Sequence, residues 1–224
     1  MKKIILSFIS CLLIVGLVTG CGNQNETSVP SVPSIADSEY GKANGEVKEL
    51  IEKMKQYKQT IIVLDYNNWS ADNNMFMLEN YYEFDLNNKV GYIHDMKVDA
   101  SGNKSSVNTE HYIDLENDVD YSRFTGWTNW SKDNYIDSLE HYLKIEYFDD
   151  YDYAKKGNVL YGRDEEHGDH FIIEIHLNNN GLVDYYTKSA ADEIWKPKEG
   201  ATPSKTSYSY SNQVISIPEE ALNA

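Results

Sequence analysis

Three histidines lie close together in the segment DEEHGDHFIIEIH, and imidazole and carboxylate groups are the side chains that bind zinc and related metals. The alternation of apolar and polar residues predicts a strand with His170, Glu174 and His176 on one face. At about 3.3 Å per residue, His170 and His176 would lie about 20 Å apart, which is too far to share an ion. Glu174 with His176, or His167 with His170 across a turn, supplies two ligands at most. We therefore expect an exposed polar face, with a metal site as the less favoured alternative.

Acidic residues are numerous, and one run of them, FDDYDY at residues 148–153, has the composition of a calcium-binding loop. The run lacks the glycine and the distal glutamate of an EF-hand loop, as do the segments DLNNKVG and DLENDVD. We interpret all three as solvated loops. Because the chain has 36 Asp and Glu residues, a pair such as Glu79 and Glu83 gives no specific sign of acid–base catalysis.

The sequence lacks the common catalytic motifs GxSxG, P-loop, GxGxxG and HExxH. It therefore gives no reason to expect an enzyme, a cofactor or a bound metal, although catalysis stays open. Charge narrows the choice of partners further. A net charge of −16 argues against nucleic acids and anionic lipid headgroups as electrostatic partners.

The thiol of Cys21 has the most specific surroundings in the chain. Two lysines precede a run of fifteen residues, IILSFISCLLIVGLV, that is interrupted only by two serines. This run is shorter than the ~20 residues of a membrane-spanning helix and is typical of a signal peptide. It ends in VTGC, which resembles the lipobox of bacterial lipoproteins. The resemblance implies cleavage before Cys21 and attachment of diacylglycerol to its thiol, with palmitate as a further acyl group.

This resemblance divides the chain into three parts. Residues 1–20 are expected to be a lipoprotein signal peptide, and residues 21–45, rich in Ser, Asn, Pro and Gly, a flexible tether. Residues 46–224 are expected to form one domain. Cys11 lies in the signal peptide, so the mature chain has no second thiol for a disulfide or a redox pair. We expect a protein held by its lipid on the extracytoplasmic face of a Gram-positive cell membrane, with an ordinary secretory signal as the alternative.

Apolar residues at helical spacing predict two amphipathic helices. The first covers residues 46–58, with Asn44 or Gly45 as its cap, and the second covers residues 135–145, with Asp133 or Asn134 as its cap. The apolar stripe of the first helix consists of Val47, Leu50, Ile51, Met54 and Tyr57.

The segments between and after these helices alternate with a period of two, which predicts antiparallel strands joined by tight turns. The turns include Asn87-Asn88 and the run NNNG at residues 178–181. The order of helix, meander strands, helix and further strands predicts an α+β fold with one large antiparallel sheet.

Two neighbouring strands each carry one apolar face. The residues of these faces are Phe76, Leu78, Tyr82 and Phe84 from one strand, and Val90, Tyr92, His94, Met96 and Val98 from the next. We expect all of them on the buried side of the sheet, where they either line a ligand cavity or fill a closed core, because alternation looks the same in both cases. His94 is expected to be a buried histidine bonded to a backbone carbonyl, with a ligand contact as the alternative.

Three phrases resemble the LolA-like bacterial lipoproteins, which include the carriers LolA and LolB and the LppX and LprG type. The phrases are HYIDLENDVDYSRFTGWTNWSK, FIIEIHLNNNGLVDYY and VISIPEEA, and the first amphipathic helix precedes them. The resemblance implies a curved antiparallel sheet, a half-open barrel whose concave apolar side is covered by helices and holds a hydrophobic or lipid ligand. It favours a non-enzymatic, membrane-anchored protein of the uncharacterised Gram-positive branch of this group.

The aromatic content, 18 Tyr and 4 Trp, suggests an alternative function. Exposed rings beside acidic groups bind sugars, so the domain could be a cell-wall glycan- or protein-binding module with a closed core. Trp127 and Trp130 would face opposite sides of a regular strand, however, and cross-strand packing explains the tyrosines more simply. A closed structural domain of the NTF2-like or cystatin-like type is the third alternative.

Overall fold

The computed structural model describes residues 34–67, 77–98, 104–166, 169–201 and 203–224. Residues Val32–Ala224 form one compact unit. Cys21 lies outside the described residues, so its lipidation stays a prediction.

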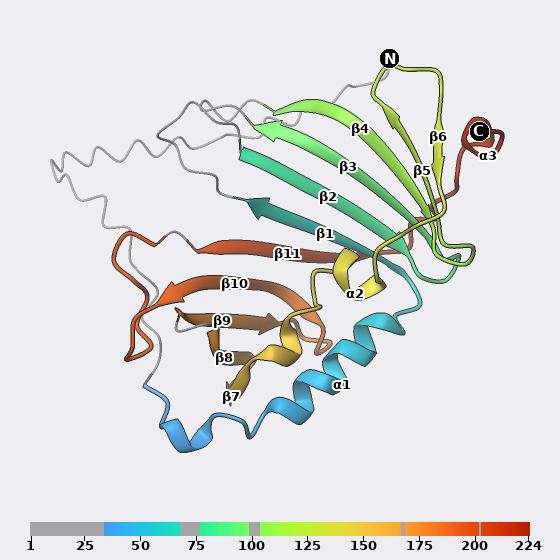
Figure 1. The fold of residues 1–224 in the computed structure, drawn as a ribbon. Helices are drawn as coiled ribbons and strands as arrows, with labels where there is room; N and C mark the ends of the chain where they lie inside the picture. The colour runs from blue at the N-terminus through green and yellow to red at the C-terminus, as the bar shows by residue number, and fades with distance from the viewer. Residues whose placement is uncertain (1–33, 68–76, 99–103, 167–168, 202) are drawn as a thin grey trace, which may run out of the picture. The chain divides into compact units, whose positions relative to one another are not determined.

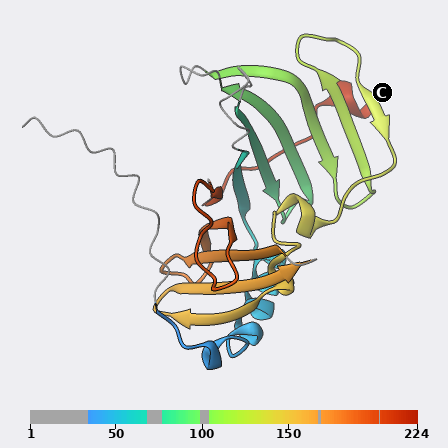
Figure 2. The same cartoon turned by 60° about the vertical axis from the view of Figure 1, so that its left-hand side comes forward.

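One antiparallel sheet of eleven strands dominates the compact unit (Figure 1). The strands are β1 (Thr60–Asn67), β2 (Met77–Asp85), β3 (Val90–Val98), β4 (Lys104–Asp114), β5 (Val119–Phe124), β6 (Ser131–Asp133), β7 (Asp152–Lys156), β8 (Val159–Glu166), β9 (Asp169–Leu177), β10 (Val183–Ala191) and β11 (Ser204–Ser211). They lie in the order β6-β5-β4-β3-β2-β1-β11-β10-β9-β8-β7, so β6 and β7 are the two edges. In Figure 2 the green strands β2–β5 and the orange strands β8–β10 run in different directions, because the sheet twists and curves. The predicted α+β fold with one large curved antiparallel sheet is confirmed.

Helix α1 (Asn44–Lys55) covers the concave side of the sheet (Figure 1). Its four buried side chains, Val47, Leu50, Ile51 and Met54, belong to the predicted stripe, but the helix ends at Lys55, so the predicted end at residue 58 is wrong and Tyr57 lies outside the helix. The predicted cap is wrong, because the N-cap residue is Ala43 and makes no side-chain cap. The Asn44 side chain instead accepts a hydrogen bond from the backbone N–H of Tyr153 at 2.8 Å, and the Ala43 N–H donates to the Tyr153 carbonyl at 3.1 Å. These bonds occupy the edge of β7 and block pairing with another strand.

Helix α2 (Leu139–Tyr142) is much shorter than the predicted helix over residues 135–145. It begins after Ser138, whose hydroxyl accepts the His141 N–H at 3.1 Å, so the predicted caps at Asp133 and Asn134 are wrong. It ends before Lys144, whose positive φ of 57° is incompatible with a continuing helix. The short 3₁₀ helix η3 (Phe148–Asp150) follows.

The hydrophobic core fills the space between the concave side of the sheet and the segments α1, α2 and η3. The largest side chains that are fully buried there include Tyr153, Phe84, Phe148, Met54, Ile61 and Ile113. The Tyr208 hydroxyl donates to the Leu143 carbonyl at 2.8 Å and thereby ties the segment after α2 to β11. This bond satisfies a polar group that would otherwise be buried without a partner.

The folded unit begins earlier than residue 46, where the sequence predicted the end of the tether. The 3₁₀ helix η1 (Asp37–Glu39) carries Asp37, whose carboxylate lies 2.7 Å from Nη1 of Arg163 on β8. The Arg163 guanidinium also lies 3.8 Å from the ring centre of Tyr40 and 5.4 Å from that of Trp195. We call this group the Arg163 clamp, and it holds residues 37–40 against the sheet.

The C-terminal residues pack on the other side of the sheet, near β5. The Ile215 N–H donates to the Asp85 carboxylate at 3.3 Å, and Ile215 is buried. Helix α3 (Glu219–Leu222) buries Ala221 against Val119 and Tyr121 of β5.

Candidate functional site

The two faces of the sheet separate residues that the sequence analysis placed together. We call the side that contacts α1 the inner face and the opposite side the outer face. Phe84 on β2 belongs to the inner core and pairs with Gly91, whereas Tyr92 pairs with Glu83. Because paired residues point to the same face and successive residues alternate, the β3 residues Val90, Tyr92 and His94 lie on the outer face. The prediction that they share the inner face with Tyr82 and Phe84 is wrong.

Gly91 explains this error. A Cβ atom added at Gly91 would lie 2.2 Å from a ring carbon of Phe84, so the Phe84 ring occupies the space of the missing side chain. The inner face of β3 therefore carries Gly91 and Ile93, and these two residues give only a weak apolar pattern in the sequence. The outer face of β3 carries the larger residues that made it look like the buried one.

The inner-face candidates fill a core, because Phe84 is 0% exposed and stacks on Tyr142 at 5.2 Å between ring centres. Tyr82 is 8% exposed and lies under the Lys144 ammonium, 4.9 Å from its ring centre. An acyl chain could reach these two rings only by displacing the segment around α2. Phe76 and the side chains of Leu78, Met96 and Val98 lie outside the described part of the structure.

The outer face of β2–β6 carries a continuous series of rings, which we call the outer aromatic row. Its members are Tyr81, His94, Tyr92, Tyr112 and Trp130, with neighbouring ring centres 4.9 to 6.1 Å apart. Burial raises the pKa of Tyr92 to about 12. His94 is thus a partly exposed member of an aromatic row and not a buried core histidine. The ring faces of Tyr92 are taken by its two neighbours, which leaves little room for a stacked sugar.

Polar groups complete this row. Tyr81 donates to Glu83 at 2.7 Å, and Arg123 donates from Nε to Glu110 at 2.8 Å. The same guanidinium lies 4.4 Å from the ring centre of Trp130. Charges and rings on this face therefore contact one another, as expected for cross-strand packing.

The histidines of the predicted metal cluster lie apart. His176 stacks on Tyr185 at 4.1 Å and its Nε2 lies 3.4 Å from Glu174, whereas His170 contacts Trp195. His167 lies outside the described residues. Within the residues that the structure describes, no group of three or more His, Cys, Asp or Glu residues could hold a metal ion.

A pocket with a cavity volume of about 620 Å³ opens at the end of the sheet where the β2–β3 and β4–β5 turns lie. We call it the turn-end pocket, and its volume is in the range of small-molecule sites. Its aliphatic residues are Leu86, Leu115, Ile136 and Leu139. All four also pack against the core, so the pocket is an extension of the concave side.

Two turns of the same design build one wall of this pocket. Asp85 begins the turn DLNN and its carboxylate accepts the Asn88 N–H at 3.1 Å and the Asn88 side chain at 2.7 Å. Asp114 begins the turn DLEN and binds Asn117 in the same way, at 3.0 and 2.8 Å. In each turn the leucine after the aspartate lines the pocket.

The residues that end the two turns give the pocket rim opposite charges. Lys89 and Asp118 follow the asparagines, have positive φ angles of 56° and 55°, and both line the pocket. Left-handed backbone is unusual at a lysine. Lys89 also lies 3.2 Å from Glu116, an exposed pair that a ligand can open at little cost.

The opposite wall connects the pocket to α1. Lys55, near the end of α1, lies 2.6 Å from Glu140 of α2. The hydrogen bond from Lys55 lowers the pKa of the Glu140 carboxyl, and the same bond raises the pKa of Lys55. Residues 134–138, which form no helix or strand, close this side and include the exposed Tyr135.

The pocket was not found from the sequence, because its residues come from four separate segments. The repeated tetrads DLNN and DLEN are the available signal, but a turn prediction at Asn87-Asn88 does not reveal that the leucine of each tetrad lines a pocket. Among the described helices, none has the length and hydropathy that a membrane crossing requires. No model of a known protein family matches this chain, and no curated protein sequence matches it.

Proposed function

We propose that this protein is a lipid-anchored, extracytoplasmic binding protein that performs no chemistry on its ligand. The VTGC segment before residue 22 supports the anchor, with diacylglycerol on Cys21. The unclosed eleven-stranded sheet with α1 on its concave side supports the likeness to LolA-like lipoproteins. The ligand is a small amphiphile bound in the turn-end pocket.

The class of ligand is inferred from the pocket wall that the DLNN and DLEN turns build. Leu86 and Leu115 present aliphatic surface, and Lys89 and Asp118 place one positive and one negative group at equivalent positions on the rim. An apolar body therefore packs on the leucines, and a headgroup with both charges pairs with the rim. A purely anionic or cationic head would meet one group of like charge.

A long acyl chain under α1 is less well supported. Met54 and Phe84 are 0% exposed, so the core at the middle of the concave side is filled by the protein itself. The turn-end pocket keeps the ligand on the concave side without opening that core.

The test uses the chain from residue 21 to 224 with Cys21→Ser, because the compact unit begins at Val32 and contains the whole described core. Calorimetric titration compares three short-chain probes at monomeric concentrations: a lysophosphatidylcholine, a fatty acid and an alkylammonium of equal chain length. We expect the zwitterionic probe to bind at least about tenfold more tightly than either charged one. Equal affinities for the three probes would contradict the proposal that the charges of the rim select the headgroup.

Two variants assign the site. Ile136→Trp fills the pocket from a segment without regular structure and should abolish binding, whereas Ile194→Trp at an exposed position outside the pocket should not. Lys89→Glu should shift the preference toward the alkylammonium probe. Binding that survives Ile136→Trp would place the ligand elsewhere.

A module for wall glycan or a protein partner is the second candidate, favoured by the exposed Trp127, which is 62% accessible. A glycan pull-down that is lost in Trp127→Ser but not in Ile136→Trp would favour it over the amphiphile.

A further inference from the structure

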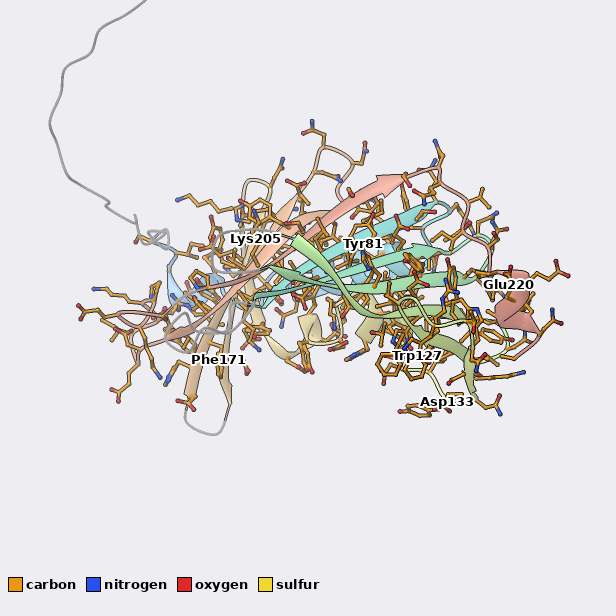
Figure 3. All side chains as sticks on the ribbon, turned by 90° about the horizontal axis from the view of Figure 1, so that it is seen from above. Tyr81, Trp127, Asp133, Phe171, Lys205 and Glu220 are labelled. Carbon is orange, nitrogen blue, oxygen red and sulfur yellow. The ribbon has the colours of Figure 1, made fainter. Side chains whose placement is uncertain are left out.

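We propose that the connection between β5 and β6 is a membrane-facing tip, and that Phe124 and Trp127 enter the interface of the bilayer to which the protein is anchored. Phe124 is 50% exposed and Trp127 is 62% exposed. Their ring centres lie 5.0 Å apart, so the two rings form one exposed apolar cluster. Figure 3 shows Trp127 toward the β5–β6 side of the molecule, on the opposite side from Phe171.

The backbone holds the two rings together. The Trp127 N–H donates to the Phe124 carbonyl at 2.9 Å, and Gly126 between them has a positive φ of 87°. These are the features of a type II turn, which needs glycine at its third position. The rings are therefore displayed by a defined turn, and their exposure does not result from a loose loop.

The charge of this segment is compatible with approach to a membrane. Residues 123–132, RFTGWTNWSK, contain two basic residues and no acidic one, in a chain with a net charge of −16. Arg123 is paired with Glu110, while Lys132 lies 5.7 Å from the ring centre of Tyr121. A membrane surface that repels carboxylates therefore meets none within residues 123–132.

Size selects a bilayer over a protein partner. Two half-exposed aromatic rings present on the order of 200 Å², whereas a stable protein interface needs about 800 Å² per partner. Tryptophan is enriched at the membrane–water interface, where its ring is buried and its N–H stays hydrated. The two rings are also tilted by 51°, so they do not form one flat platform for a sugar.

The anchor keeps the whole domain near the bilayer. The chain from Cys21 to the first described residue, Ser34, spans roughly 45 Å at full extension, so the domain stays close to the bilayer and can turn toward it. This inference rests on the anchoring part of the proposed function but is independent of the turn-end pocket.

The test replaces the predicted lipid by a chemical anchor. Cys21 is the single thiol of the chain from residue 21 onward, so it can be coupled to a maleimide phospholipid in phosphatidylcholine vesicles. Quenching of tryptophan fluorescence by brominated acyl chains is then measured for the native sequence and for Trp127→Phe. We expect strong quenching that falls by at least half in Trp127→Phe. Quenching that is absent, or equal in both proteins, would overturn the proposal.

The uncoupled chain gives a second measurement that needs no anchor. We expect Phe124→Ser/Trp127→Ser to reduce its partitioning to phosphatidylcholine vesicles by about tenfold. The control is Val214→Ser, at an apolar residue that is 72% exposed elsewhere, and it should leave partitioning unchanged. An equal loss in the control would show nonspecific adsorption and would contradict the proposal. Because both measurements use an imposed anchor or none, a failure of natural lipidation at Cys21 does not affect them.

Discussion

The inner and outer faces of this sheet contain many of the same residue types but use them differently. On the inner face, Phe84 is fully buried against Tyr142 of α2, and Tyr153 is fully buried in the same core. On the outer face, Tyr92 and Tyr112 are half-buried and are covered by neighbouring rings of the same row. A tyrosine on a strand thus fits either a helix-covered core or a solvent-facing row, because its ring packs against neighbouring side chains in both. Whether a side chain of this sheet is fully buried therefore depends on whether helices cover its face, and not on its residue type alone.

The two faces should differ most in how much stability is lost when one aromatic ring is removed from each. Phe84→Ala should lower the free energy of unfolding by about 3–5 kcal/mol, since it leaves a cavity in a packed core. Tyr92→Ala should lower it by only about 1 kcal/mol, because the ring is partly solvated and its neighbours can close over the gap. Urea denaturation of both variants measures this. Equal losses would mean that the outer aromatic row is a second core.

A smaller effect is expected from adding one methyl group. Gly91→Ala places a carbon 2.2 Å from the Phe84 ring and should lower the free energy of unfolding by about 1–3 kcal/mol. Gly45→Ala is the matched control, because its Cβ would contact nothing within 4 Å and alanine favours the helix. It should be neutral or slightly stabilising. A tolerated Gly91→Ala would indicate that Phe84 can move and that the inner face has room for a ligand.

The stability of the protein at alkaline pH should depend on the outer aromatic row. Burial raises the pKa of Tyr92 to about 12, from about 10 in the unfolded chain. Between pH 10 and 12 the unfolded state therefore loses a proton that the folded state keeps, so stability is full below pH 10 and falls as the pH rises. Tyr92→Phe should make the decline less steep. A decline of unchanged steepness would assign it to other tyrosines, such as those of the inner face.

The smallest predicted effect concerns the link between α1 and α2 beside the pocket. The Lys55 hydrogen bond lowers the pKa of Glu140, so its contribution is present above the ordinary carboxyl pKa and is lost as the pH falls through the lowered value. Both side chains are about one-third exposed, so Glu140→Gln should lower the stability by less than about 1 kcal/mol at neutral pH. At low pH the variant and the native chain should unfold at the same urea concentration.

Periodicity was sufficient to predict the sheet and α1, because a period of two and a stripe at helical spacing each have one common structural meaning. It failed for the face of β3, where Gly91 hides the inner position. It failed for α2 as well, where Ser138 and Lys144 set boundaries that the apolar spacing ignores.

The candidate sites show a different limit. The turn-end pocket joins residues 86, 115 and 136–139, and only the strand order brings these segments together. The repeated tetrads DLNN and DLEN place two leucines, Leu86 and Leu115, at equivalent positions in the sequence. This repeat does not predict that both leucines lie in one pocket with Lys55 at the end of α1, because that arrangement depends on how the sheet curves.

The Arg163 clamp has a mechanical consequence. Any tension transmitted along the chain toward Ser34 meets the Asp37–Arg163 ion pair and the Tyr40 ring before it reaches the strands. Behind the clamp, the bonds from Ala43 and Asn44 pass the load to Tyr153 on the edge strand β7. Without the clamp, a force on the chain could detach β7 from β8 by breaking their hydrogen bonds one after another. With it, the force must first separate the guanidinium from two rings and a carboxylate at once, so the sheet resists the detachment of its edge strand by a force applied at residue 34.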